Sequence, residues 1–208
     1  VRDLYGTPEG IRVGLADGSE VRARLVIGAD GANGIVATRM GFDHPIESAV
    51  ALEGNLPCPD GPPEWLTGKV ALSLGWLPGG YGWLFPKGDH INVGVGGWKA
   101  VVGSRLRDSL DEYTRSFGWE PSMLTNLRGH HLPMQRPGMP VASVAAAVIG
   151  DAAGFVDPLS GEGIYAAIAS GVAVASPRCQ ARRPTSPAGT AWARTACTAR
   201  RAVGVASA

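Results

Sequence analysis

The stretch that decides the fold reads VIGDAAGFVDPLSGEGI and occupies residues 148–164. An apolar run over residues 141–149 leads into it, which is the pattern of a buried strand that carries Asp151 to its end. Gly150 and Gly154 bracket this carboxylate and let a ligand approach the backbone, because glycine has no side chain in the way. The stretch therefore predicts a strand that ends in a glycine-bracketed acid.

A glycine-rich turn then opens a helix. Gly161 and Gly163 precede a run of mostly small or apolar residues over 164–175, which predicts a helix whose first amides are uncovered. Such amides attract anions and electron-rich carbonyl oxygens. Residues 161–166 also fit the letters of a GxGxxA dinucleotide turn, but no strand directly precedes them and no βαβ unit follows.

A second glycine-acid corner lies upstream, where residues 25–33 read LVIGADGAN. The apolar residues predict a buried strand that ends at Gly28. Asp30 and Gly31 then bend the chain. An ordinary Asp-Gly turn after a strand is the alternative interpretation of this corner.

The rest of the chain predicts hairpins and short helices. Apolar residues alternate on either side of Asp17 and Gly18, which predicts a hairpin, and a short helix is expected over 35–40. Leucine and aromatic residues at helical spacing predict an amphipathic helix over 104–117, with Ser104 as its cap. Three antiparallel strands are expected over residues 70–77, 81–85 and 91–95.

Three aromatic residues, Tyr81, Trp83 and Phe85, alternate along one of these strands and so share one face of the sheet. A face of this kind is either simple core or the wall of an apolar cavity. The histidines at 90, 130 and 131 have no partners in the sequence pattern, and we expect them to have surface or packing roles.

The composition limits the classes of protein to be considered. A chain of 208 residues with 45% hydrophobic and 18% charged residues can form one or two ordinary globular cores. No apolar run reaches the roughly 18 to 20 residues of a spanning helix, and no secretory signal is visible. We therefore expect a cytoplasmic protein with at most peripheral membrane contact. Three scattered cysteines predict neither a disulfide framework nor a metal site.

The C-terminal residues 176–208 differ from the rest of the chain. They contain six arginines and no acid, which leaves thirteen basic against eighteen acidic residues elsewhere. The segment has no hydrophobic periodicity and begins where a proline stops a helix. We expect a disordered, atypical tail produced by a change of reading frame. A nucleic-acid arm is the alternative, without aromatic or fold support.

These motifs together resemble one protein family. Residues 148–164 are similar to the second flavin-binding motif of the FAD-dependent oxidoreductases related to para-hydroxybenzoate hydroxylase and geranylgeranyl reductase, and residues 25–33 resemble the other signature of that superfamily. Residues 81–88, YGWLFPKG, followed by NVGVG at 92–96, resemble the block typical of the geranylgeranyl reductase branch. The chain is identified as a member of this branch that is truncated at its N-terminus.

The resemblance implies an α/β (α+β) fold, in which a partial FAD-binding Rossmann-like domain contains an inserted antiparallel-sheet substrate domain. The implied ranges are 1–41 and 141–175 for the two pieces of the FAD-binding domain, 42–140 for the substrate domain and 176–208 for the tail. In the family an N-terminal strand, glycine turn and helix bind the ADP half of FAD, and no such unit precedes Gly28. The resemblance therefore suggests that a partner chain supplies the missing unit.

The resemblance also implies a cofactor site. Asp151 would accept a hydrogen bond from a ribityl hydroxyl, with a helix cap as the alternative role. The amides of Gly161, Gly163 and Ile164 would face the pyrimidine end of the flavin, where Glu162 is either a solvated helix-start acid or part of the site. The implied cofactor-binding residues are Asp30, Gly31, Gly150, Asp151, Ala152, Gly154, Pro158, Gly161, Gly163 and Ile164.

The function implied is reduction of isoprenoid double bonds by hydride from reduced FAD, with NAD(P)H as the electron donor and no assigned catalytic residue. Tyr81, Trp83 and Phe85 would bind the prenyl substrate. Two alternatives stay open: an aromatic hydroxylase that uses NAD(P)H and O₂, and a non-catalytic fragment of such a flavoprotein. We expect a small-molecule or prenyl-lipid substrate and no nucleic-acid partner.

Overall fold

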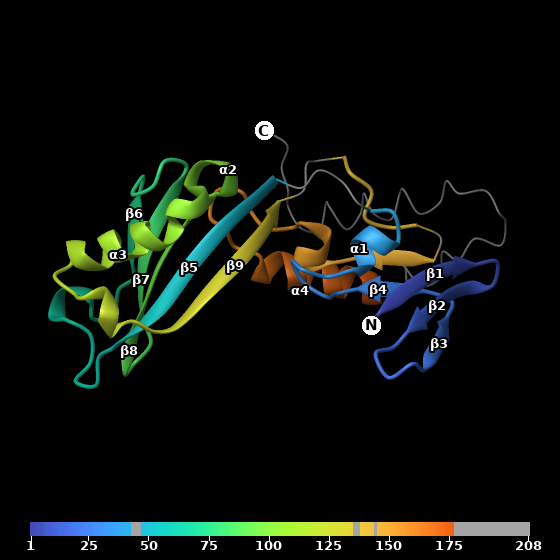
Figure 1. Ribbon diagram of the computed structural model, residues 1–208, viewed down its shortest axis with the longest axis horizontal. Helices are drawn as coiled ribbons and strands as arrows, with labels where there is room; N and C mark the ends of the chain where they lie inside the picture. The colour runs from blue at the N-terminus through green and yellow to red at the C-terminus, as the bar shows by residue number, and fades with distance from the viewer. Residues whose placement is uncertain (43–46, 135–137, 144, 177–208) are drawn as a thin grey trace. The chain divides into compact units, whose positions relative to one another are not determined.

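The computed structural model describes residues 1–42, 47–134, 138–143 and 145–176 (Figure 1). The chain divides into two compact units. The first contains Val1–Glu47 and the segment that starts at Pro133, and the second contains Ser48–Leu132. The tail expected over 176–208 lies outside the described residues, apart from Ser176.

The first unit begins with a three-stranded antiparallel sheet in the order β1-β2-β3. Its turn between β2 and β3 is closed by Asp17, whose Oδ1 accepts hydrogen bonds from the amide of Ser19 at 2.9 Å and its hydroxyl at 2.6 Å. The predicted hairpin is confirmed, and β1 is an additional strand. The strands are β1 (Asp3–Thr7), β2 (Gly10–Gly14) and β3 (Glu20–Ala23).

The centre of the first unit is a parallel pair of short strands, β4 (Val26–Gly28) and β10 (Ala146–Val148). The prediction that β4 is buried is wrong for Ile27, whose exposed fraction is 41%. No described strand pairs with the other edge of β4. Strand β10 is shorter than the predicted 141–149. The predicted helices are present as α1 (Val36–Arg39) and α4 (Ile164–Ala175).

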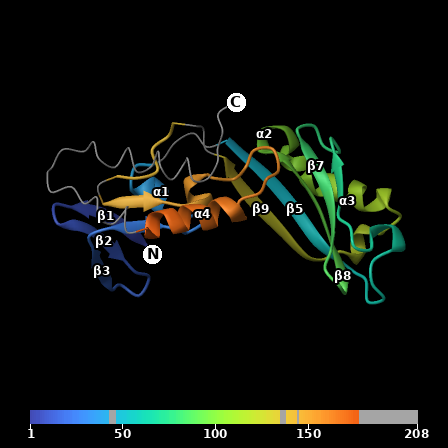
Figure 2. The same cartoon turned by 180° about the vertical axis from the view of Figure 1, so that it is seen from behind.

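The second unit is built on a five-stranded sheet in the order β6-β7-β8-β5-β9 (Figures 1 and 2). The three predicted strands are confirmed, and their neighbours in the sheet pair in antiparallel fashion. Two strands, β5 and β9, were not predicted. The strands are β5 (Glu47–Pro57), β6 (Ala71–Leu74), β7 (Gly80–Pro86), β8 (His90–Trp98) and β9 (Thr125–Met134).

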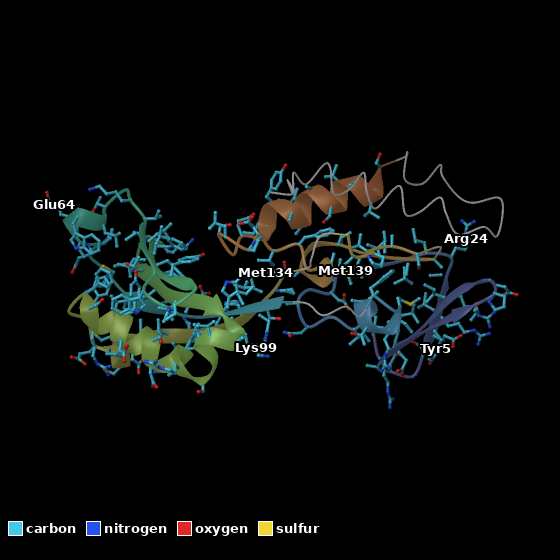
Figure 3. All side chains as sticks on the ribbon, turned by 90° about the horizontal axis from the view of Figure 1, so that it is seen from above. Tyr5, Arg24, Glu64, Lys99, Met134 and Met139 are labelled. Carbon is cyan, nitrogen blue, oxygen red and sulfur yellow. The ribbon has the colours of Figure 1, made fainter. Side chains whose placement is uncertain are left out.

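Helix α3 (Leu106–Ser116) covers one face of this sheet (Figure 3). Its fully buried Leu110 and Tyr113 pack in one cluster with Leu84 on β7 and with Val93 and Val95 on β8. This cluster is the hydrophobic core of the second unit.

The short helical turns of the second unit correct one prediction. Ser104 lies in the single 3-10 turn Gly103–Arg105, between α2 (Lys99–Val102) and α3, and α3 has no side-chain cap. The predicted capping role of Ser104 is therefore wrong. Further 3-10 turns span Glu64–Leu66 and Pro121–Met123.

The contact between β7 and α3 predicts the cost of one added methyl group. A Cβ at Gly82 would lie 2.5 Å from the Tyr113 ring. We expect Gly82→Ala to lower the free energy of unfolding by about 2 kcal/mol, because overpacking forces the ring to move. Gly129→Ala on β9 is the control, since a Cβ there has no neighbour closer than 3.9 Å. Equal denaturation midpoints for the two variants would contradict this account of the core.

Candidate functional site

The structure brings the two glycine-acid corners to the same end of the parallel strand pair. Val148 pairs with Gly28, and the amide of Ile149 donates to the Gly28 carbonyl at 3.0 Å. Asp30 and Asp151 follow these strands by two and three residues. Ligands of open parallel sheets bind beyond the carboxyl ends of the strands. The pairing of β4 with β10 therefore places the two corners after neighbouring strands.

The carboxylate of Asp30 is used by the fold. Its Oδ2 accepts hydrogen bonds from the amides of Ile35 at 2.7 Å and Val36 at 3.0 Å, where α1 begins. Gly31 has φ +75°, and its carbonyl accepts the amide of Gly34 at 3.0 Å. The Asp30 side chain is thus occupied by the start of α1.

A pocket of about 490 Å³ lies beside this corner, within the first unit. Its wall is apolar where it is formed by Leu4, Val13 and Ile27, and it is polar at Asp30 and Asn33. Val26 and Ile27 of β4 also line it.

The Asp151 corner is a single 3-10 turn, Gly150–Ala153, tied to α4. The amide of Gly150, a residue with φ +55°, donates to the hydroxyl of Ser170 at 3.1 Å. Ser170 in turn donates to the Ala166 carbonyl at 2.7 Å. Ala152 is buried in the core of the first unit, and Gly154 has the left-handed φ of +68° that ends the turn. The buried hydroxyl thus fixes the turn relative to the helix.

The Asp151 carboxylate has no hydrogen-bond donor among the residues that the structure describes. The helix-cap alternative is therefore not what the structure shows. Burial raises the pKa of Asp151, and the negative charge of Glu162 raises it further. A Cβ at Gly163 would lie 2.8 Å from Oδ1 of Asp151, so the carboxylate lies against the backbone where α4 begins. An acceptor without a donor suits a ligand hydroxyl.

The loop before α4 is held by Asp157, which the sequence analysis did not single out. Its Oδ1 accepts the amide of Leu159 at 3.1 Å and both the amide and hydroxyl of Ser160 at 2.8 Å. These bonds lower the pKa of Asp157, with the Ser160 amide as the largest cause. The order Asp-Pro-Leu-Ser was the available signal, because Asp side chains commonly bond amides two or three residues later.

In the same loop, one of the three amides that were expected to face the flavin is already hydrogen-bonded within the chain. Gly161 donates to the Asp157 carbonyl at 2.9 Å, so its amide is not free. The amides of Gly163 and Ile164 make no hydrogen bond to any residue in the described part of the chain. Glu162 accepts the amide of Tyr165 at 2.9 Å and is a helix-start acid. Pro158 lies exposed in this loop.

The aromatic residues of the second unit form a strip on β7. Ring centroids are 5.8 Å apart for Tyr81 and Trp83, and 6.1 Å apart for Trp83 and Phe85. Because Gly82 and Leu84 point toward α3, this strip lies on the opposite face of the sheet. Trp83 is 8% exposed and its neighbours are half-buried. The strip is therefore not part of the α3 core.

The histidines have local partners. His90 Nδ1 lies 2.7 Å from Oδ1 of Asp89, and His130 Nε2 lies 3.2 Å from Oε1 of Glu53. His131 is exposed. Within the described ranges, no group of three or more His, Cys, Asp or Glu side chains has a metal-binding arrangement. None of the helices in those ranges is long and apolar enough to cross a membrane.

Charge and burial give Asp151 and Asp157 opposite effects on stability. A raised pKa means that the folded state holds the Asp151 proton more tightly than the unfolded chain does, so stability falls as the pH rises through that pKa. We expect Asp151→Asn to raise the melting temperature at pH 7 by about 1–3 °C, with a gain that shrinks toward pH 4. Asp157→Asn should lower it at pH 7, because its lowered pKa stabilises the fold at neutral pH. Melting curves from pH 4 to 8 check this, and shifts of the same sign would contradict it.

No family model matches the chain. Several curated proteins do match it. The chain is 32% identical over 157 residues to the chloroplastic geranylgeranyl diphosphate reductase of Oryza sativa, which covers 70% of this chain and 32% of the relative. It is 36% identical over 167 residues to the menaquinone reductase of Mycobacterium tuberculosis, and the match covers 72% of this chain and 40% of the relative. It is 30% identical over 165 residues to the digeranylgeranylglycerophospholipid reductase of Methanoculleus marisnigri, covering 74% and 39%.

The chain thus spans between about a third and two fifths of the length of these relatives. Solved structures share its fold. A geranylgeranyl bacteriochlorophyll reductase-like protein from Thermoplasma acidophilum superposes with a TM-score of 0.75 at 23% identity, covering 96% of this chain and 52% of that one. A putative FAD-containing monooxygenase from Photorhabdus luminescens superposes with a TM-score of 0.61 at 18% identity, and the match covers 99% of this chain and 65% of that one. The predicted fold class is confirmed.

Proposed function

We propose that this chain, which is homologous to part of the geranylgeranyl reductases and related reductases, forms the flavin-facing and substrate-facing parts of an FAD-dependent enzyme that reduces isoprenoid double bonds. The observation that carries the proposal is the arrangement at the end of β10. There a half-buried carboxylate without a donor, Asp151, lies against the start of α4, where the amides of Gly163 and Ile164 have no acceptor in the described chain.

The residues present fit the flavin half of FAD. Asp151 offers an acceptor to a ribityl hydroxyl, and the two free amides offer donors to a carbonyl oxygen of the ring. Gly150 and Gly154 are buried and have positive φ angles that shape the turn, and the missing Cβ of Gly150 leaves room for Ala167 on α4; we assign them to the site as part of this turn. We assign a cofactor-binding role also to Ala152, Pro158 and Gly161, which build the turn and loop, and to the backbone of Asp30 and Gly31 on the neighbouring strand end.

The start of α4 also sets the charge that the cofactor meets. The positive end of a twelve-residue helix favours negative charge at Gly163 and Ile164. Asp151 and Glu162 place negative charge beside it, which the positive helix end partly offsets. Bound FAD would supply the hydride chemistry, and these residues would bind and orient its ring.

The free edge of β4 supports a further element in the complete enzyme. The amide of Val26 donates to the Ala145 carbonyl just before β10, and the Gly28 carbonyl accepts from the Ile149 amide just after it. The intervening Ile27 therefore directs its backbone groups to the other edge. We propose that a parallel strand of an ADP-binding unit pairs there. It belongs either to the parent polypeptide or to a partner chain.

The sheet face of the second unit supplies the proposed substrate contacts. Tyr81, Trp83 and Phe85 would line the path of a prenyl chain, because they form an aromatic strip outside the α3 core. A prenyl-lipid substrate agrees with the names of the curated relatives. NAD(P)H is the proposed source of electrons, and contact with a membrane that holds such lipids would be peripheral.

The free edge of β4 leads to a prediction about cofactor choice. We expect the 208-residue chain alone to bind FAD and FMN with affinities equal within about threefold, since only the shared flavin half meets assigned residues. Asp151→Ala should weaken both by about tenfold, the worth of one charged hydrogen bond. Asp89→Asn in the second unit is the control. Titration followed by flavin absorbance measures both effects, and a clear preference for FAD would contradict the proposed division of contacts.

The reaction itself has a direct test. With chemically reduced FAD and no oxygen, we expect geranylgeraniol to gain one hydrogen molecule per reduced double bond, measured by mass spectrometry. Addition of an N-terminal ADP-binding unit in trans should raise the yield. Oxygen insertion into a phenol under air, without prenyl reduction, would favour an aromatic hydroxylase. Loss of all flavin binding would favour a non-catalytic fragment.

A further inference from the structure

The indole of Trp83 occupies the space above a glycine on the next strand. Gly94 on β8 is directly opposite Trp83 on β7. A Cβ at Gly94 would lie 2.0 Å from Cζ2 and 2.2 Å from Cε2 of the indole. Gly94 does not have a positive φ, so its backbone does not require glycine. The space taken by the ring is therefore the reason that only glycine fits there.

A hydrogen-bond chain fixes the other side of the same ring. The indole Nε1 donates to Oδ1 of Asn92 at 2.8 Å. Asn92 in turn donates from Nδ2 to Oδ1 of Asn55 at 3.3 Å, and Asn55 is directly opposite Asn92 on β5. The indole is thus oriented by side chains from the two strands that follow β7 across the sheet.

The orientation of Trp83 sets that of the whole strip. Its ring lies between Tyr81 and Phe85, at 5.8 Å and 6.1 Å. The strip continues onto the edge strand β6, because Leu72 is opposite Trp83 and Leu74 is opposite Tyr81. These leucines are 53% and 79% exposed. The face therefore presents an apolar track that runs from β6 to the indole.

We infer that Gly94 and Asn92 are positioning residues that keep the Trp83 indole flat on β8 and so set the length of prenyl chain that this face accepts. The inference rests on the proposed prenyl-binding role of the strip. A methyl group at position 94 lifts the ring away from β8 and shortens the apolar track. Loss of the Asn92 acceptor releases the indole N–H, which then turns toward water.

The chain offers a matched control on the same strand. Gly96 lies on the same face of β8, and a Cβ there would come no closer than 3.3 Å to Ala51 and 3.5 Å to Trp83. Gly94→Ala and Gly96→Ala therefore add the same methyl group with different steric consequences. For the hydrogen bond, Asn92→Leu removes the acceptor, and Asn92→Asp keeps an oxygen for the indole N–H.

The experiment measures binding of dansyl-labelled geranylgeranyl and farnesyl probes to the full 208-residue chain, together with near-ultraviolet circular dichroism. We expect Gly94→Ala and Asn92→Leu to weaken binding of the longer probe about tenfold, the shorter probe less, and to change the aromatic spectrum. Gly96→Ala and Asn92→Asp should stay within about twofold of the unaltered chain. Trp83→Phe shows whether the strip binds prenyl chains at all.

The outcomes separate the inference from the proposed function. If Trp83→Phe weakens binding but Gly94→Ala behaves like Gly96→Ala, the positioning inference is wrong and the prenyl site stands. If Trp83→Phe binds both probes as the unaltered chain does, the prenyl site fails, and the inference about specificity fails with it. If Gly94→Ala does not fold, the double variant Trp83→Phe with Gly94→Ala decides: recovery of the fold supports the steric contact with the indole, and no recovery contradicts it.

Discussion

The parallel pairing of β4 with β10 is the constraint on which the candidate site depends. The two strands are three residues long and are far apart in the sequence, yet their carboxyl ends carry both glycine-acid corners. Gly28 permits this pairing, because a Cβ there would lie 2.7 Å from Val36 and 2.9 Å from Val148. The close approach of strand, helix and strand at this glycine therefore sets where Asp30 and Asp151 lie.

Although the two acids follow paired strands, the structure gives them different tasks. Asp30 holds the start of α1 through two amides, so its charge is satisfied within the fold. Asp151 has no such donor in the described chain, and burial together with Glu162 raises its pKa. A carboxylate kept in this state costs stability, and the cost is offset when a ligand donates a hydrogen bond. The difference in hydrogen bonding thus distinguishes an acid that is satisfied within the fold from the acid to which we assign the proposed ligand.

Much of this fold could be predicted from patterns of period two or 3.6 and from turn residues. The hairpin around Asp17, strands β6 to β8 and helix α4 all have such patterns. Strand β9 has none, because seven of its ten residues are exposed and no apolar alternation is needed there. The corners were also predictable as glycine-acid motifs. Two hydrogen bonds were not predictable: the one from Gly161 to Asp157 and the one from Trp83 to Asn92. They depend on the three-dimensional course of the backbone.

Three glycines show how the sequence encodes these side-chain positions. Gly34, Gly94 and Gly163 all lack a positive φ, so none of them is required by backbone conformation. At each, the missing Cβ leaves room for a side chain of the site or of the aromatic strip, which is Asp30 at Gly34, Trp83 at Gly94 and Asp151 at Gly163. Each of these glycines makes room for one specific side chain, and the local sequence does not show which side chain that is. Substituting such a glycine would therefore move a specific side chain rather than loosen the backbone, which makes these positions sharper probes of the site than the turn glycines.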